Sequence, residues 1–310
     1  MKVLFIPFSE TWQNEEQKAL VINSASSRWR CEYVAKYIPF AEIYKRDVTK
    51  LPGDFDVVVF QKAYTQEMVV IAKFLKLQGK KIVFDLCDAD WVKPEAFLPI
   101  SEMAKLADHL VASTFYIQEY LIKIYRKPTT LIVDRIDLEK YPDSQVKCHA
   151  QTENQRIVWV GNRNTIKYLN LFNEVLYQTC SEHPFTLRLI SDQFNEYQCP
   201  DSMKVVTEEI KWNLDTVDGY IRDCDIMINP HDLNEEVGKA KSDNKTILAW
   251  SLGLPVVSHG NDKRIKSLLL AYLKSAEKRN KAGLLGRKFV KELYDSKISA
   301  TEYRLIFNNL

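Results

Sequence analysis

Short apolar runs rich in Val, Ile and Phe alternate with longer segments of helical period along most of this chain. This alternation is typical of a parallel β-sheet covered by helices on both faces, and it occurs twice. The expected strands are residues 2–8, 41–46, 56–61, 81–86, 109–113 and 130–133 in the first half, and 156–160, 185–190, 203–206, 225–228 and 255–258 in the second. The sequence therefore predicts an α/β protein built from two similar halves.

A polar, aperiodic stretch over residues 142–154 separates the two series and is interpreted as an interdomain linker. The 310 residues are enough for two domains of ordinary size. We therefore expect a first domain over residues 1–148 and a second over 149–310. The tail from 265 onward is helical in composition.

Composition excludes several classes of protein. The net charge of +2 gives no field that would draw the chain onto nucleic acid, so no nucleic-acid partner is expected. The 9 glycines include neither a GxGxxG fingerprint nor a GxxxxGK[ST] loop. The 6 cysteines form no CxxC pair and have no neighbouring histidine at zinc spacing, which indicates reduced thiols and predicts no metal site.

The sequence predicts where in the cell the protein is found, because it shows neither a secretion signal nor a membrane-spanning segment. The start, Met1 to Pro7, resembles a first β-strand and has no basic leader or cleavage site, and no run approaches 18 apolar residues. A cytoplasmic protein is expected. Lysines surround the apolar helix expected at 66–77 and would suit peripheral contact with an anionic membrane at the inner membrane surface, although such a stretch is usually just the solvated face of a helix. These lysines are Lys73, Lys76, Lys80 and Lys81.

Ordered motifs in both halves carry a resemblance. Gly238-Lys239 forms a glycine-lysine turn before a helical segment that ends in Gly253-Leu254-Pro255-Val256-Val257. Further matches are 158–163 (Val-Trp-Val-Gly-Asn-Arg), 225–230 before the turn, 131–138 at the end of the first half, Ser26 to Arg30, and Asp85-Leu86-Cys87-Asp88. Together they resemble the family 4-like glycosyltransferases of the GT-B fold. The resemblance implies two Rossmann-like domains, with a final helix (about 298–310) that packs back on the N-terminal domain.

The resemblance also implies an activity. Such enzymes move a sugar from a nucleotide-sugar donor, here a co-substrate rather than a cofactor, to a glycan or lipid-linked acceptor, as in polysaccharide biosynthesis. A retaining, metal-independent reaction is expected. Many of these enzymes carry two glutamates at the positions of Ala240 and Leu248. Their absence keeps open a catalytically silent sugar-nucleotide-binding or partner subunit, and an epimerase of nucleotide sugars remains a third alternative.

Cations and backbone N–H groups are the groups that a metal-free site needs to neutralise a departing diphosphate. Lys241 is expected to face solvent. The plain alternative for each lysine is a solvated surface charge, and for the histidine a structural role. The resemblance assigns donor binding to Gly161, Arg163, Lys167, His231, Lys239, Asn244 and Lys245.

Asp85 and Asp88 follow an expected strand, where a carboxylate can orient an acceptor hydroxyl or a donor hydroxyl, and they are the candidate catalytic residues. A helix cap or a turn is the alternative role for each. Arg28 and Arg30 begin a helix whose end would face the cleft, a position suited to an acidic group on the acceptor. Ordinary surface arginines are the alternative interpretation.

Overall fold

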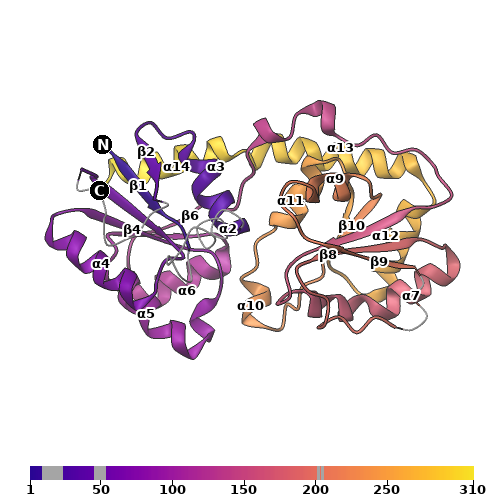
Figure 1. The fold of residues 1–310 in the computed structure, drawn as a ribbon, viewed down its shortest axis with the longest axis horizontal. Coiled ribbons are helices and arrows are strands. Elements are labelled where there is room, and N and C mark those ends of the chain that lie inside the picture. Colours follow the sequence, from indigo (N-terminus) through magenta and orange to yellow (C-terminus); the bar gives the residue numbers. More distant parts are fainter. Residues whose placement is uncertain (9–23, 45–53, 201–202, 204–205) are drawn as a thin grey trace. The chain divides into compact units, whose positions relative to one another are not determined.

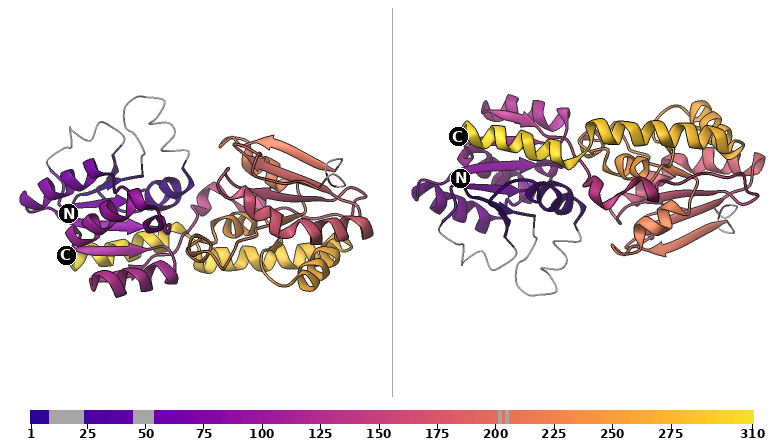
Figure 2. Two further views of the ribbon diagram at one scale, coloured as in Figure 1. Left: turned by 90° about the horizontal axis from the view of Figure 1, so that it is seen from below. Right: turned by 90° about the horizontal axis from the view of Figure 1, so that it is seen from above.

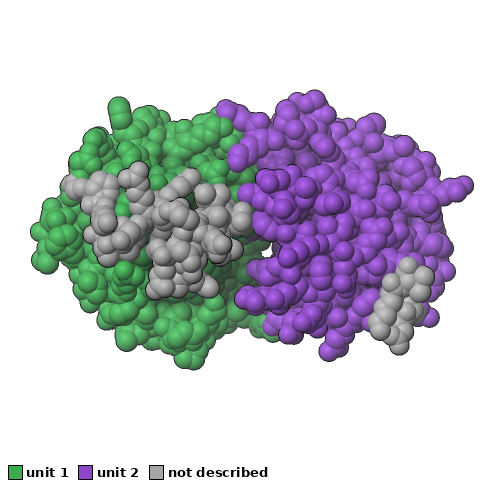
Figure 3. All heavy atoms as spheres, viewed as in Figure 1, with its two compact units in different colours: residues 1–137, 234–242, 294–310 green, residues 138–233, 243–293 purple. Residues whose placement is uncertain are grey.

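The computed structural model describes residues 1–8, 24–44, 54–200, 203 and 206–310. The chain divides into two compact units, shown in different colours in Figure 3. Unit 1 comprises Met1–Asp137, Asn234–Ser242 and Tyr294–Leu310, and unit 2 comprises Leu138–Leu233 and Asp243–Leu293. Residues 9–11 and the end of the expected strand 41–46 lie outside the described residues.

Unit 1 is built on a six-stranded parallel sheet in the order β2-β1-β3-β4-β5-β6 (Figure 1). The apolar runs of the sequence form these strands because both faces of the sheet are covered. Their bounds are β1 (Val3–Ile6), β2 (Ala41–Ile43), β3 (Val57–Gln61), β4 (Lys81–Leu86), β5 (His109–Ala112) and β6 (Thr129–Leu131).

Three helices cover one face of this sheet: α4 (Gln66–Leu77), α5 (Pro94–Leu106) and α6 (Phe115–Tyr125). Threonine hydroxyls cap two of them, since Thr65 accepts from the backbone of Met68 and Thr114 from that of Ile117. The other face packs against α3 (Tyr33–Ala35) and α14 (Ser296–Asn308). Shorter elements are α2 (Ala25–Ser27), the π-helical turn η1 (Arg28–Glu32), and the 3₁₀ turn η3 (Asp90–Val92).

The last helix belongs to unit 1. In α14, Ala300, Tyr303, Ile306 and Phe307 pack into the core that β1 and β3 form on that face. Arg135 anchors the helix further through Glu302, at 2.9 Å from Arg135 Nη2 to Glu302 Oε1. Figure 2 shows this yellow helix lying along the strands of unit 1. Both chain ends therefore lie in the same unit.

A short internal segment, Asn234–Ser242, also packs with unit 1, although the sequence prediction placed it in the second domain. It contains α10 (Glu236–Lys239). Ala240 is fully buried in the apolar core beneath α4, α5 and α6. Trp91 Nε1 donates to Glu236 Oε2 at 3.1 Å, and Ser242 donates to Asp134 Oδ2 at 2.6 Å. An apolar anchor and polar contacts thus hold the segment on unit 1.

Unit 2 has a five-stranded parallel sheet in the order β11-β10-β7-β8-β9. Of the strand expected at 203–206, residues 204 and 205 lie outside the described residues; the edge strand of this sheet is at 207–211, and Met203 packs in the core. This strand is polar because it occupies the edge of the sheet, so an apolar run does not mark it. The bounds are β7 (Arg156–Val160), β8 (Thr186–Ser191), β9 (Thr207–Lys211), β10 (Ile226–Ile228) and β11 (Val256–Val257).

The helices of unit 2 pack around this sheet, and η6, α7 and α12 share one apolar core with β7 and β8. On α13, a Cβ at Gly283 would overlap the carbonyl oxygen of Gly253, so only glycine allows this close approach. The remaining bounds are η6 (Ile166–Phe172), α7 (Asn173–Glu182), α9 (Val217–Arg222), α11 (Asn244–Ser251), α12 (Asp262–Leu273) and α13 (Ala276–Leu293).

The expected linker is structured along part of its length and belongs to unit 2. The 3₁₀ turn η4 (Leu138–Lys140) precedes it, and it contains the 3₁₀ turn η5 (Asp143–Gln145). Arg287 of α13 contacts Asp143 Oδ1 at 3.1 Å and donates to the carbonyl oxygen of Tyr141 at 2.5 Å. Among the described residues, no helix combines the length and the apolar composition that crossing a bilayer requires.

Candidate functional site

The end of β4 in unit 1 carries the two candidate catalytic carboxylates in different environments. Asp85 is the penultimate residue of the strand and is fully buried, and Asp88 lies two residues beyond the strand in a partly exposed turn. Asp85 pairs with Arg30, whereas Asp88 pairs with Lys62. The two carboxylates therefore belong to separate groups of charged residues.

Asp85 lies in a buried ionic network with Arg30. Arg30 Nη2 contacts Asp85 Oδ1 at 2.8 Å, and Arg30 Nη1 contacts Asp134 Oδ1 at 2.8 Å. The Tyr303 hydroxyl donates to Asp85 Oδ2 at 2.7 Å. Burial acts to lower the pKa of Arg30, but the two carboxylates outweigh it and hold this pKa well above its ordinary value.

This network differs from the ligand-facing placement that the sequence predicted for Arg30 and Asp85. The side chain of Arg30 is 2% exposed and that of Asp85 is 0% exposed. The arginine is buried because the π-helical turn η1 places it at the carboxyl-terminal end of β4, where Asp85 and Asp134 supply the compensating charges. Arg28, in the same turn, is buried as well.

Asp88 lies between two lysines. Lys62 Nζ is 2.7 Å from Asp88 Oδ2, and Lys241 Nζ is 2.7 Å from Asp88 Oδ1. Lys62 also contacts Asp90 at 3.1 Å. Burial acts to raise the pKa of Asp88, but the two lysines outweigh it and hold this pKa well below its ordinary value. Asp88 is therefore ionised at neutral pH.

Lys241 was expected to face solvent, and that expectation is wrong: its side chain is 25% exposed and paired with Asp88. Sequence reasoning also gave no role to Lys62, which follows β3. Lys62 has a left-handed backbone with φ of 54°, a conformation rare for a residue with a Cβ. Its position after a strand was the only available signal, because strand-end loops of parallel sheets hold functional groups.

In unit 2, several predicted donor residues follow the strands of the sheet. Gly161 follows β7, and a Cβ there would lie 2.5 Å from the Trp159 ring and 2.7 Å from Thr165 Oγ1. Lys245, in the first turn of α11 beside Asn244, places its Nζ 4.8 Å from the centroid of the Trp159 ring. Gly161 and Lys245 are thus brought to the same tryptophan.

The loop after β10 connects to the same helix. Asn229 Nδ2 donates to Thr246 Oγ1 at 3.3 Å, which joins the end of β10 to the first turn of α11. His231 lies 5.8 Å from His259 and 6.4 Å from Tyr168, measured between ring centroids. Each of these residues lies after a strand or in the segment that follows one. His231 is therefore at the strand-end edge where the sequence placed it.

The remaining predicted donor residues have surroundings of their own. The Arg163 backbone N–H donates to Asp192 Oδ1 at 2.7 Å, which joins the loops after β7 and β8. Lys167 is exposed and its Nζ lies 5.1 Å from the centroid of the Tyr168 ring. Lys239 is exposed on α10, within unit 1. The predicted donor set is therefore divided between the two units.

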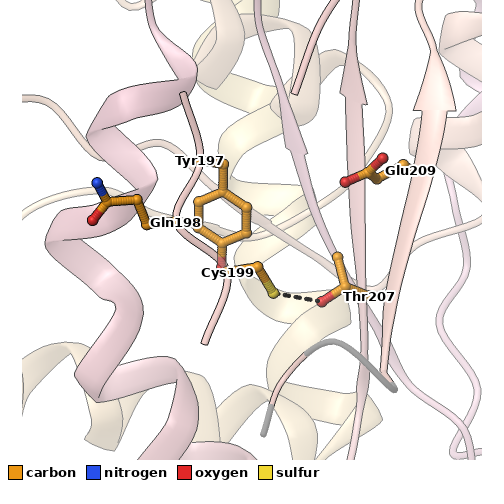
Figure 4. Close-up of a pocket in the computed structure, with 5 residues that line it drawn as sticks. All are labelled: Tyr197, Gln198, Cys199, Thr207 and Glu209. Carbon is orange, nitrogen blue, oxygen red and sulfur yellow. Dashed lines mark hydrogen bonds between the residues drawn. The ribbon is translucent and has the colours of Figure 1, made fainter. Parts of the chain in front are cut away.

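Unit 2 also has an open cavity of about 560 Å³ beside β9 (Figure 4). Cys199 Sγ lies 3.6 Å from Thr207 Oγ1, at the first residue of that strand. This position is at the opposite end of the strands from Gly161, where ligands do not usually bind in open α/β sheets. Within the described ranges, no three His, Cys, Asp or Glu side chains gather where they could hold a metal ion. The lining residues are Tyr197, Gln198, Cys199, Thr207 and Glu209.

The two sheets and the helices around them define the GT-B glycosyltransferase fold. The structure of Anabaena HepE, solved in complex with UDP-glucose, matches with a TM-score of 0.71 at 12% identity over 100% of both chains. A glycosyltransferase from Rickettsia africae matches with a TM-score of 0.64 at 10% identity, covering 99% of this chain and 98% of its own.

A third similar structure is the catalytic domain of starch synthase IV from Arabidopsis thaliana, bound to ADP and acarbose. It matches with a TM-score of 0.56 at 10% identity over 82% of this chain and 72% of that domain. No protein-family model matches the sequence, and no curated protein matches it. At these identities the likeness establishes the fold.

Proposed function

We propose that this protein is a glycosyltransferase that moves a hexose-like sugar from a nucleotide-sugar donor to a glycan or other acceptor. The observation that carries the proposal is the arrangement around Trp159 in unit 2. There, Gly161 brings backbone close to the ring and Lys245 places a cation over it, at the start of α11. A helix N-terminus with a lysine beside a glycine loop suits the diphosphate of a nucleotide.

The chemistry follows from the charge that develops on the donor. Breaking the anomeric C–O bond leaves a nucleoside diphosphate, and fixed cations and backbone N–H groups stabilise it. Lys245, Arg163 and Lys239 are the cations that we assign to this role, with Lys167, Asn244 and His231 as further donor contacts. A site of this type supports metal-independent transfer. The fold likeness to HepE, solved with UDP-glucose, supports a uridine nucleotide as the first donor to test.

We do not assign the role of general base to Asp85 or Asp88, the two carboxylates at the end of β4. Asp88 is ionised and held by Lys62 and Lys241, so it is a weak proton acceptor at neutral pH. We assign it to positioning, and Asp85 to the buried network. A retaining reaction, in which a donor phosphate oxygen takes the acceptor proton, needs no protein base and is the mechanism that we propose.

Ala240 favours a second candidate, a sugar-nucleotide-binding subunit without turnover. Position 240 is where the family resemblance expects a glutamate, and here the alanine is fully buried in the core of unit 1. The side chain at position 240 therefore packs in the core and cannot supply the carboxylate that the resemblance expects there. The two candidates share donor binding and differ in sugar transfer and donor hydrolysis.

Calorimetric titration with UDP, ADP and GDP and their glucose conjugates tests the proposal, followed by an assay of sugar transfer and donor hydrolysis with and without EDTA. Lys245→Ala should weaken nucleoside-diphosphate binding by about ten- to a hundredfold, since it removes a charge-assisted contact of about 1.5–3 kcal/mol. Lys278→Ala, at an exposed lysine of α13, is the matched control and should bind as the wild type does.

Each outcome decides between the candidates. Binding with turnover that persists in EDTA supports a metal-independent transferase. Binding without turnover supports the silent subunit. Turnover that EDTA abolishes and Mg²⁺ or Mn²⁺ restores contradicts metal independence. If no nucleotide binds, or if Lys245→Ala binds as tightly as Lys278→Ala, the assigned donor site is wrong.

A further inference from the structure

Helix α4 of unit 1 exposes a line of apolar side chains that the core of the unit does not use. Val70, Phe74 and Leu77 are 57%, 58% and 87% exposed. Their spacing of four and three residues places them on one side of the helix. The opposite side, with Met68, Val69, Ala72 and Leu75, already fills the core. The helix is thus apolar on both sides, which folding of unit 1 alone does not require.

The neighbouring helix α5 also exposes apolar side chains, near its amino-terminal end. In α5, Phe97 and Leu98 are 51% and 61% exposed. The two helices lie side by side on the same face of the sheet (Figure 1), and Lys73 of α4 reaches Glu102 of α5 at 3.2 Å. We call the set Val70, Phe74, Leu77, Phe97 and Leu98 the α4–α5 surface. Exposed apolar side chains grouped on adjacent helices mark an interaction site more often than scattered ones do.

Lysines surround the carboxyl-terminal ends of both helices. Two carboxylates offset part of this charge, since Glu102 pairs with Lys73 and Asp108 with Lys76 at 2.6 Å. At the same edge of the sheet, Asp54 pairs with Lys2, and Asp56 lies 3.9 Å from the amino terminus. Cations remain in excess. The lysines are Lys73, Lys76, Lys80, Lys81, Lys105 and Lys127.

Lys127 shows how closely these cations are grouped. Its Nζ donates to the carbonyl oxygen of Ala107 at 2.6 Å, beside the last turn of α5. Burial lowers the pKa of Lys127, and the positive charge of Lys76 lowers it further. Like charges thus gather beside Phe74 and Leu77 at the carboxyl-terminal end of α4, which suits an extended negative partner.

We propose that the α4–α5 surface docks unit 1 on an anionic lipid bilayer. Apolar side chains of this kind insert at the boundary between headgroups and acyl chains, while the long lysine side chains reach the phosphates. Each lysine near an anionic bilayer contributes attraction that salt screens.

Co-sedimentation of the full chain with vesicles tests the proposal without any substrate. Vesicles of phosphatidylcholine alone are compared with vesicles that contain 30% phosphatidylglycerol. Wild-type protein should bind the anionic vesicles, and 0.5 M NaCl should weaken this binding. The double variant Phe74→Gln/Leu77→Gln should bind at least about tenfold less, because each side chain that inserts contributes apolar area.

Matched variants separate docking from general effects. Leu305→Gln, at a leucine of α14 that is 60% exposed in the same unit, should bind as the wild type does. Lys80→Glu/Lys81→Glu should reduce binding to anionic vesicles by at least about tenfold. All variants alter solvent-exposed or partly exposed side chains, so circular dichroism and melting temperatures should stay near those of the wild type.

Three results would overturn the proposal. Binding to neutral and anionic vesicles alike, or to neither, excludes an anionic bilayer as the partner. An equal loss in Leu305→Gln shows that the α4–α5 surface is not specific. A wild-type dimer in light scattering that Phe74→Gln/Leu77→Gln dissociates identifies a second copy of the chain as the occupant. Nucleotide affinity is expected to stay unchanged in every variant, so a failure here is distinct from a failure of the proposed transferase.

Discussion

The hydroxyl of Tyr303 donates a 2.7 Å hydrogen bond to Asp85 Oδ2, joining the last helix to the end of β4 across 218 residues of sequence. Asp85 accepts from Arg30 at the same time, at 2.8 Å. The last helix thus supplies a partner to a fully buried carboxylate. Through this bond, the position of α14 and the ionic network under the sheet depend on each other.

Tyr303→Phe should lower the stability of unit 1 by about 1–3 kcal/mol, because the buried Asp85 then loses a hydrogen bond that nothing replaces. Thermal unfolding followed by circular dichroism measures this change. Tyr177→Phe, at a tyrosine of α7 that is 44% exposed, is the control and should melt within about 1 °C of the wild type. Equal melting temperatures of Tyr303→Phe and wild type would show that the hydroxyl contributes nothing.

A second buried carboxylate, Asp225 in unit 2, predicts the response to acid. Burial acts to raise the pKa of Asp225, but the hydrogen bonds from His149 and from the backbone of Arg156, with the charges of Lys147 and Arg279, outweigh it. Together they lower the pKa of Asp225 to about 2. An unfolded aspartate titrates near 3.9, so the unfolded chain binds more protons below about pH 5.

Asp225 therefore contributes stability that is fully present above about pH 5 and is lost as the pH falls toward 2. The expected contribution is about 2 kcal/mol. Melting temperatures of the wild type and Asp225→Asn between pH 3 and 7 test this. The difference between the two should narrow as the pH falls. A difference that stays constant over this range would assign the effect of Asp225 to packing.

Gly161 provides a steric test of the candidate donor site. A Cβ at this position would lie 2.5 Å from the ring of Trp159, so Gly161→Ala must displace the loop or the ring that Lys245 faces. We expect at least about tenfold weaker binding of UDP by calorimetry. Gly219→Ala is the matched control, since a Cβ there meets no atom within 4 Å and alanine favours the helix α9. Equal UDP affinity in the two variants would place the nucleotide elsewhere.

Much of the architecture was predictable because buried parallel strands leave short apolar runs that alternate with segments of helical period. The runs at β3 and β4 are buried along almost their whole length and were found within a residue. Strand β9 was missed for the opposite reason, since its exposed side chains at the sheet edge are polar. The packing of residues 234–242 with unit 1 could not be predicted. One buried alanine, Ala240, makes no repeating pattern of apolar residues that would mark the segment as part of a core.

The site was less predictable than the fold, because burial depends on long-range pairing. Arginine side chains are ordinarily exposed, so the sequence gives no sign that Arg30 is buried. Its burial is stable only because Asp85 and Asp134 lie beside it in the folded chain. Lys241 shows the same limit, since its partner Asp88 lies 153 residues away in the sequence. The positions of Gly161 and Lys245 were easier to predict, because strand ends and helix starts are marked locally.

Lys239 and Lys241 give the last prediction, because two lysines that are neighbours in sequence have different environments. Lys239 is exposed on α10, whereas Lys241 pairs with Asp88 at 2.7 Å. Lys241→Met should destabilise unit 1 by about 1 kcal/mol, since the ion pair is partly exposed and is one of several contacts that hold residues 234–242 on this unit. Lys239→Met should leave the melting temperature unchanged and weaken UDP binding.

A double-mutant cycle makes this contrast quantitative. If Asp88 and Lys241 stabilise each other, Asp88→Asn/Lys241→Met should be less destabilised than the sum of its two single variants. The pair Asp88→Asn and Lys239→Met should instead be additive, because no contact joins their side chains in the described structure. Lys241→Arg should recover most of the lost stability, since a guanidinium can reach the same carboxylate. Coupling of zero between Asp88 and Lys241 would mean that the apolar anchor alone holds residues 234–242 on unit 1.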